Sequence, residues 1–184
     1  LERTHKDLGA HGIKLGPIYQ GVHPHDRRYR EIYAYAERHR LPILIHMATT
    51  FASAAPLEYA RPILMDDIAA DYPELSIILA HLGHPWSGEA ISVIRRRPNV
   101  YADLSALYYR PWQFYNTMRL LTEYGCAHKV FFGSDYPFTL PGDSVKNVRN
   151  VNAILKNSGL PPVPEDIIEG IINRDALGIL GIES

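Results

Sequence analysis

The sequence lacks the features that mark secreted, membrane-spanning or nucleic-acid-binding proteins. It holds a single cysteine in 184 residues, which excludes an internal disulfide and favours a reducing compartment, the cytoplasm. No apolar run approaches the roughly 18 residues that span a bilayer. The formal net charge of −1 gives no electrostatic reason to bind nucleic acid or an anionic membrane. We therefore expect a small-molecule substrate as the main partner.

The composition favours a packed core. Hydrophobic residues make up 46% of the chain and charged residues 21%, a balance that argues against disorder. The one basic run, Arg95 to Arg97, precedes Pro98 and is interpreted as the solvated end of a helix, where cations are favoured. Cys126 is interpreted as an inert packing residue.

Short apolar runs alternate with amphipathic stretches along the chain. The runs predict five strands, at 13–15, 42–46, 75–80, 99–103 and 129–133. Apolar residues at helical spacing predict helices near 29–36, 57–68, 89–96, 114–121 and 148–155, with a closing helical segment at 165–180.

Five successive strand–helix units require parallel strands with right-handed crossovers. A doubly wound sheet and a (β/α)₈ barrel both satisfy this requirement, but no G-x-G-x-x-G follows the first strand. The prediction is therefore an α/β protein of the (β/α)₈ TIM-like barrel class. A complete barrel needs about 250 residues, so we expect about five of its eight units here.

Three metal-competent residues follow different predicted strands. His46 closes the second strand, His81 closes the third, and Asp135 comes just after the fifth. Active sites of parallel barrels form where the carboxyl ends of the strands meet. Imidazole and carboxylate groups are the ligands expected for Zn²⁺ or a similar divalent ion. The pattern thus predicts a metal or catalytic site.

Four further residues are candidates for contacting substrate, each with a structural alternative. Lys14 ends the first strand and either binds a substrate carboxylate or pairs with a neighbouring acid. Asp103 ends the fourth strand and either contacts substrate or forms buried hydrogen bonds. His84 and Trp86 lie in the loop after His81. They either line the pocket or, in the case of His84, cap that loop.

These residues belong to blocks that resemble the amidohydrolase-related family, which includes aminocarboxymuconate-semialdehyde decarboxylase and the resorcylate decarboxylases. The blocks run nearly from end to end of the chain. They are Gly12–Leu15, Leu41–His46, Ala80–Gly83 with Pro85 and Trp86, Asn99–Ser105, Phe132–Phe138, and the closing Asn173 with Ala176 and Leu177. The Gly-Ser-Asp-Tyr-Pro segment together with the two strand-end histidines is the specific part of this resemblance.

The resemblance implies a distorted barrel whose metal is held by an H-x-H or E-x-H pair on strand one, a histidine on strand five and an aspartate on strand eight. His46 and Asp135 match the last two ligands, and His81 matches the strand-six histidine beside the metal. The first strand of this chain then matches the family's fourth. We therefore expect residues 1–184 to be part of one barrel domain without strands one to three. Zinc is the favoured ion and manganese the alternative.

The resemblance also implies the chemistry. Asp135 would bind the metal and take a proton from water, while His81 would stabilise charge on the substrate or shuttle a proton. The expected function is metal-dependent hydrolysis of an amide, lactone or ester by a homo-oligomer, a dimer in the intact enzyme. Non-oxidative decarboxylation at the same metal shell is one alternative, and a non-catalytic remnant is another.

Overall fold

The five strands pair in a single parallel sheet. In the computed structural model, which describes residues 1–182, they are β1 (Ile13–Leu15), β2 (Ile43–His46), β3 (Ile77–Ala80), β4 (Val100–Asp103) and β5 (Val130–Phe131). The strands lie side by side in the order in which they occur along the chain. A doubly wound sheet would reverse this order partway across, whereas a barrel wall does not. The observed order is therefore that of a barrel wall.

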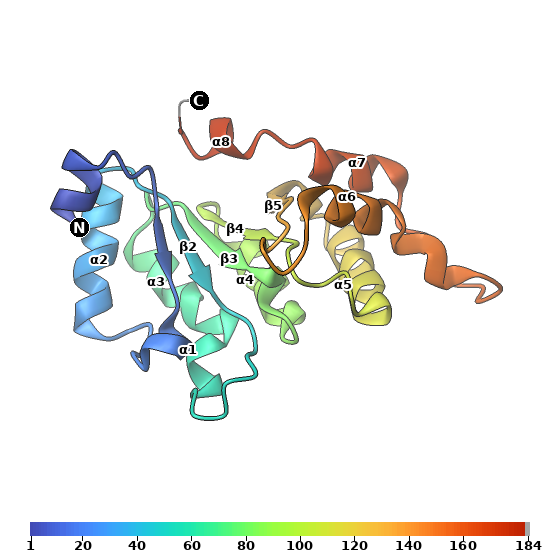
Figure 1. Cartoon of the computed structure of the whole chain (residues 1–184), viewed down its shortest axis with the longest axis horizontal. Helices are drawn as coiled ribbons and strands as arrows, with labels where there is room; N and C mark the ends of the chain where they lie inside the picture. Colours follow the sequence, from blue (N-terminus) through green and yellow to red (C-terminus); the bar gives the residue numbers. More distant parts are fainter. Residues whose placement is uncertain (183–184) are drawn as a thin grey trace.

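Helices follow the strands and pack beside the sheet (Figure 1). They are α1 (Pro17–Gln20), α2 (Arg27–Arg38), α3 (Met65–Asp71), α4 (Ser87–Arg96), α5 (Pro111–Glu123), α6 (Pro141–Arg149), α7 (Glu165–Ile172) and α8 (Ala176–Ile179). A π-helical turn spans Arg3–Asp7. Short 3₁₀ turns span Leu57–Ala60, Pro62–Leu64, His81–Gly83, Ala127–Lys129 and Val151–Leu155. Within residues 1–182, none of the helices combines the length and the apolar character needed to cross a membrane.

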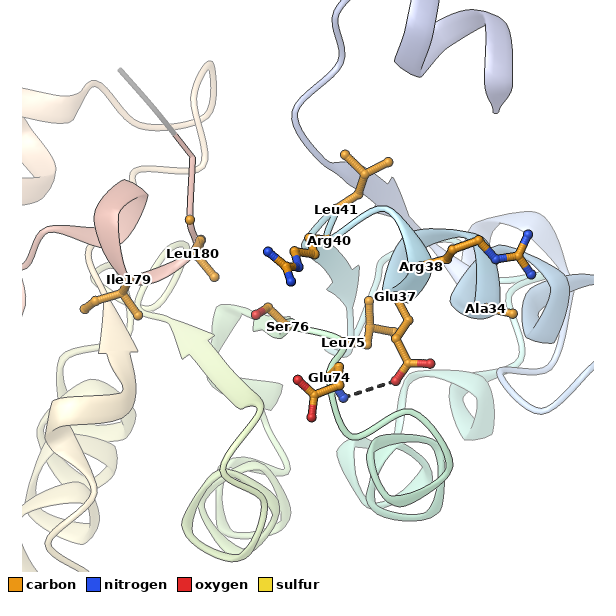
Figure 2. A pocket seen from close by; sticks show the side chains of 11 residues that line it. Ala34, Glu37, Arg38, Arg40, Leu41, Glu74, Leu75, Ser76, Ile179 and Leu180 are labelled. Atoms are coloured by element: carbon orange, nitrogen blue, oxygen red, sulfur yellow. Dashed lines mark hydrogen bonds between the residues drawn. The ribbon is translucent and has the colours of Figure 1, made fainter.

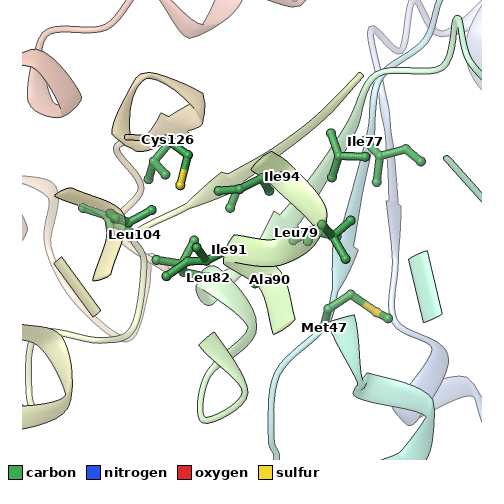
Figure 3. Packing of buried hydrophobic residues seen from close by; sticks show 14 of the residues in the cluster. Met47, Ile77, Leu79, Leu82, Ala90, Ile91, Ile94, Leu104 and Cys126 are labelled. Atoms are coloured by element: carbon green, nitrogen blue, oxygen red, sulfur yellow. The ribbon is translucent and has the colours of Figure 1, made fainter. Parts of the chain in front are cut away.

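The two faces of the sheet carry different residues because side chains alternate along a strand. Ile77 and Leu79 of β3 are fully buried and share one cluster with Ile91 and Ile94 of α4 (Figure 3). Burying each such side chain contributes about 1.5–3 kcal/mol. The other face, with Ile78 and its neighbours, lines an open pocket instead. The helix-covered face therefore holds the core, and the opposite face is the inner surface of the barrel.

A buried lysine joins the end of α4 to the start of β5. Nζ of Lys129 donates to the carbonyl oxygens of Arg97, at 3.0 Å, and Pro98, at 2.6 Å. The ammonium also lies over the ring of Tyr101, and burial lowers its pKa. A cation at the carboxyl end of a helix satisfies carbonyls that have no partner within the helix. This contact fixes the approach to the strand that precedes Asp135.

The predicted strands were nearly correct, but four predicted elements were wrong in extent. The helix expected near 148–155 is instead the end of α6, which begins at Pro141 and stops at Arg149, followed by the 3₁₀ turn Val151–Leu155. The helix expected at 57–68 begins only at Met65, because Pro62 has no backbone N–H and starts a separate turn. The closing segment at 165–180 breaks into α7 and α8, where the Asp175 side chain accepts from the N–H of Gly178 and caps α8. The fifth strand pairs only over Val130–Phe131.

The turn after β3 has an unusual backbone. His81, Leu82 and Gly83 have φ values of 57°, 44° and 68°, all in the left-handed region. Gly83 is also closely surrounded: a Cβ atom there would lie 2.5 Å from Cγ of Pro62 and 2.8 Å from Cβ of Ala90. Only glycine fits this position, because both the backbone angle and the space exclude a side chain.

We therefore expect Gly83→Ala to lower the free energy of unfolding by about 1–3 kcal/mol, from steric overlap and left-handed strain. Gly88→Ala is the matched control. Gly88 lies in the first turn of α4, and a Cβ added to it would meet no heavy atom within 4 Å, so alanine should be neutral or slightly stabilising there. Urea unfolding of both variants measures the difference. Equal stability of the two would contradict this account of the turn.

Candidate active site

The register of the sheet brings polar residues to one rim. His46 pairs with Ala80, the residue before His81, and Asp103 pairs with Phe131, four residues before Asp135. His46, His81 and Asp135 line one pocket of about 170 Å³. The predicted residues thus meet at the carboxyl ends of the strands, the end that carries the active site in parallel barrels.

His46 is buried and held neutral. Its ring lies 4.9 Å from that of His81, centroid to centroid, and its Nε2 is 3.0 Å from the carbonyl oxygen of Ala48 and 3.4 Å from Oη of Tyr19. Burial lowers its pKa to about 4, and the charges of His81 and Lys14 act in the same direction. A carbonyl can only accept, so Nε2 carries the proton in this arrangement. A metal bound at that nitrogen would replace this proton.

His81 is fixed by contacts with the segment that ends β4. Its backbone N–H donates to Oδ1 of Asp103 at 3.1 Å, and its Nδ1 lies 2.7 Å from Oγ of Ser105. All three residues are buried. Among residues 1–182 no hydrogen bond reaches Nε2 of His81, which leaves this atom free for a ligand or substrate.

Asp135 lies just beyond β5 on a left-handed turn, with φ of 61°. Its carbonyl oxygen accepts from the N–H of Phe138 at 2.9 Å, which closes the turn. Asparagine and aspartate tolerate this backbone region better than most residues. The carboxylate faces both the small pocket and a larger one.

The larger pocket, of about 680 Å³, follows the inner face of the sheet and is lined by Lys14, His81, Asp103, Ser105 and Asp135 among apolar residues. Partial burial lowers the pKa of Lys14, against the opposing effect of the Asp103 and Asp135 charges. Within the described chain its ammonium makes no ion pair with either acid. Lys14 is thus available to a substrate anion in this pocket.

The two candidates in the loop after His81 are placed differently. His84 is buried and lines the small pocket. Burial lowers its pKa, and the charges of Arg110 and His81 add to this effect. Trp86 lines neither pocket: it precedes α4, with the guanidinium of Arg61 over its ring at 5.6 Å. The structure therefore brings His84, but not Trp86, to the site.

Three pocket residues were missed by the sequence analysis. Ser105 follows Asp103 by two residues, a spacing that gave a usable signal because alternate residues share a face. Tyr19, in the short helix α1, and Arg110, the residue before α5, also line the small pocket. No sequence pattern marks them, since their approach depends on how the loops pack.

The donor types at this rim fit a divalent ion, but their number is incomplete. A neutral imidazole on His46 and a carboxylate on Asp135 are both suitable ligands. Across residues 1–182, however, no group of three or more His, Cys, Asp or Glu side chains is arranged to hold a metal. His46 and Asp135 therefore supply part of a coordination shell at most.

A cavity of about 720 Å³ lies at the other end of the strands (Figure 2). Leu41 and Ser76 line it just before β2 and β3, and Ile179 and Leu180 close it from the C-terminal segment. The Glu37 side chain accepts from the backbone N–H of Glu74 at 3.1 Å. Its position at the amino ends of the strands marks it as a structural gap rather than the catalytic end.

Comparisons with known proteins identify the fold. An uncharacterised TIM-barrel protein from Bordetella bronchiseptica is 25% identical with a TM-score of 0.71, over 96% of this chain and 59% of its own. A dihydroxybenzoic acid decarboxylase from Polaromonas, solved with manganese and 2-nitroresorcinol, is 15% identical with a TM-score of 0.64, over 98% and 63%. A probable 2-pyrone-4,6-dicarboxylic acid hydrolase from Acinetobacter baumannii, with citric acid bound, is 16% identical with a TM-score of 0.64, over 96% and 66%.

The barrel prediction is thus confirmed, and the chain forms part of one. It spans about three fifths to two thirds of the length of these structures. A comparison with curated proteins finds no match. A family model described as amidohydrolase matches residues 1–181. Since that match covers nearly the whole chain, the chain belongs to the amidohydrolase family.

Proposed function

We propose that this chain forms much of the catalytic domain of a metal-dependent hydrolase acting on a small carbonyl or carboxylate substrate. The observation that supports this best is the meeting of His46, His81 and Asp135 in one pocket at the carboxyl ends of the strands. The remaining metal ligands would come from residues outside this chain. The family match and the printed names of structural relatives support the same class of chemistry.

A divalent ion held in part by His46 and Asp135 would supply Lewis acidity and acidify water. The chain's own residues would handle protons and charge. The Asp135 carboxylate would accept the proton of the attacking water. His81 would act at its Nε2, the ring nitrogen without a protein partner. General acid–base groups of this kind contribute about 10²–10⁴-fold to rate.

Cations and aromatic rings around the pockets would select the substrate. Arg110 lines the small pocket with its guanidinium 4.7 Å above the ring of Tyr109. Lys14 lies in the adjoining larger pocket. Both would attract an anionic substrate group. Phe51 and Phe138 add exposed aromatic rings to the lining of the small pocket.

Non-oxidative decarboxylation is the second candidate. The observation that favours it is structural similarity to a dihydroxybenzoic acid decarboxylase with bound manganese. The same cations would hold the carboxylate that is lost as CO₂. A proton would then be delivered to the carbon atom that had carried the carboxylate.

Product analysis separates the two reactions. The intact protein, loaded with Zn²⁺ or Mn²⁺, is incubated with a panel of small amides, lactones and esters and with hydroxylated aromatic acids. Incorporation of ¹⁸O from labelled water indicates hydrolysis, and release of CO₂ indicates decarboxylation. Neither reaction with either metal across the panel would favour the inert alternative.

Metal binding tests the role proposed for His46. His46→Ala should weaken Zn²⁺ affinity at least tenfold. Losing even a residue that only hydrogen-bonds to a metal ligand lowers metal affinity about 10–100-fold. His81→Ala should leave affinity nearly unchanged. His128→Ala, an exposed position outside both pockets, is the matched control. Calorimetric titration of the four proteins gives the answer, and equal affinity for the wild type and His46→Ala would refute a ligand role for His46.

Turnover tests the role proposed for Asp135. Asp135→Asn should lower kcat by about a hundredfold or more, since it removes the proposed base and a charged ligand. The fold should persist, because asparagine tolerates the left-handed backbone. The control is Asp143→Asn in the exposed first turn of α6, which should keep full activity. Steady-state kinetics and circular dichroism test both expectations. A fully active Asp135→Asn variant would mean that the chemistry lies elsewhere.

The depressed pKa of His46 predicts a pH dependence of stability in the metal-free protein. The ordinary value is 6.5, and the folded-state value is about 4. The unfolded chain therefore takes up the proton first as pH falls. Stability should be fully present above pH 6.5 and decline towards pH 4, by roughly 2–3 kcal/mol from this residue.

Urea unfolding between pH 7 and pH 4.5 measures this slope. His46→Gln should flatten it over that range, because glutamine does not titrate. Parallel slopes for the wild type and His46→Gln would contradict the prediction. The comparison of the two proteins cancels the contribution of carboxylates and of His84, whose pKa is also lowered.

A further inference from the structure

A chain of hydrogen bonds runs from the ring of His81 into the end of β4. Nδ1 of His81 lies 2.7 Å from Oγ of Ser105. The Ser105 hydroxyl donates to Oδ1 of Asp103 in a short contact. The same Oδ1 accepts the backbone N–H of Ser105 at 2.9 Å and that of His81 at 3.1 Å.

The direction of each hydrogen bond follows from the chemistry of the groups. An ionised carboxylate can only accept, so the single hydroxyl proton of Ser105 is committed to Asp103. Towards His81 the Ser105 oxygen can then only accept. The proton between them must therefore belong to Nδ1 of His81. In the neutral ring this leaves a bare lone pair on Nε2, which has no hydrogen-bond partner within the described residues.

Burial favours this one direction of the hydrogen-bond chain over its reverse. His81, Asp103 and Ser105 are 9%, 9% and 5% exposed, so water does not compete freely for the hydrogen bonds. Reversing the chain would take the hydroxyl donor away from Oδ1 of Asp103 and leave it only the two backbone N–H groups, so the carboxylate would lose a charge-assisted hydrogen bond. Gly133 lies close by: a Cβ on it would be 3.3 Å from Cβ of Ser105.

We propose that Ser105 and Asp103 are positioning residues that fix His81 as the Nδ1–H tautomer, with the Nε2 lone pair facing the pocket that it shares with Asp135. The catalytic role of this tautomer rests on the proposed function. The assignment of the tautomer rests only on the hydrogen bonds among His81, Ser105 and Asp103.

This assignment separates the two roles that the sequence left open for His81. A bare Nε2 cannot donate a hydrogen bond to a substrate oxygen, so neutral His81 does not stabilise developing negative charge in that way. It can accept a proton. In hydrolysis the Asp135 carboxylate would accept the proton of the attacking water and pass it to Nε2 of His81. His81 would then donate this proton to the leaving group as the scissile bond breaks. His81 would end neutral, as it began, and Asp135 would be restored as the carboxylate.

Nitrogen NMR of the metal-free protein tests the proposal. The protein is labelled with ¹⁵N-histidine and studied at pH 8, where a histidine of ordinary pKa is neutral. The His81 signals are assigned by their loss in His81→Gln. Two-bond ¹H–¹⁵N correlations should show a proton-bearing Nδ1 and a bare Nε2 in the wild type. A wild-type ring protonated at Nε2 would overturn the proposal.

Variants of Ser105 test whether its hydroxyl fixes the tautomer of His81. Ser105→Ala removes the acceptor and should shift the ring away from the Nδ1–H form, towards a mixture or Nε2–H. Ser105→Thr keeps a hydroxyl and should retain the wild-type pattern. Ser92→Ala is the matched control, since Ser92 is exposed on α4 with its hydroxyl bonded to the carbonyl of Gly88. An unchanged His81 tautomer in Ser105→Ala would also overturn the proposal.

The result is independent of metal and substrate. Loss of the proposed function, seen as absent turnover or unaltered metal affinity in His46→Ala, would leave the NMR pattern untouched. A wrong tautomer would leave the metal and turnover results untouched. If Ser105→Ala proves unfolded by circular dichroism, the wild-type spectrum and Ser105→Thr still decide the outcome.

Discussion

Parallel pairing of the strands is the constraint on which the site depends. Each strand enters the sheet in the same direction, so every carboxyl end reaches the same rim. The register makes this alignment specific, with His46 opposite Ala80 and Asp103 opposite Phe131. A slip of one residue would turn each of these side chains to the other face. The backbone hydrogen bonds of the sheet therefore determine which side chains meet.

The residues at this rim depart from ordinary backbone geometry. His81, Leu82 and Asp135 have positive φ, which costs of order 1–3 kcal/mol each for residues other than glycine. The fully buried Leu82 and its neighbours in the core offset that cost. Tight packing and the carboxylate of Asp103 hold the His81 turn in place. The unusual backbone of the rim thus rests on the packed core beneath it.

Much of the fold could be predicted from the sequence because buried parallel strands are continuous apolar runs. Helix extents failed where proline or a side-chain cap interrupted the periodicity, as at Pro62 and Asp175. For the site, strand-end position located His46, His81 and Asp135, since topology alone brings such residues together. It did not reveal Ser105 as a partner of His81, because that contact depends on side-chain direction across two strands.

The segments after β2 and β3 differ in their tolerance to substitution. The turn after β3 has no room for a side chain at Gly83, so this position is a poor site for substitution. The loop after β2 carries Phe51, which is 96% exposed at the small pocket. Its side chain can change without disturbing the core. A laboratory library for new specificity belongs in this loop, where diversity leaves His46 and His81 in place.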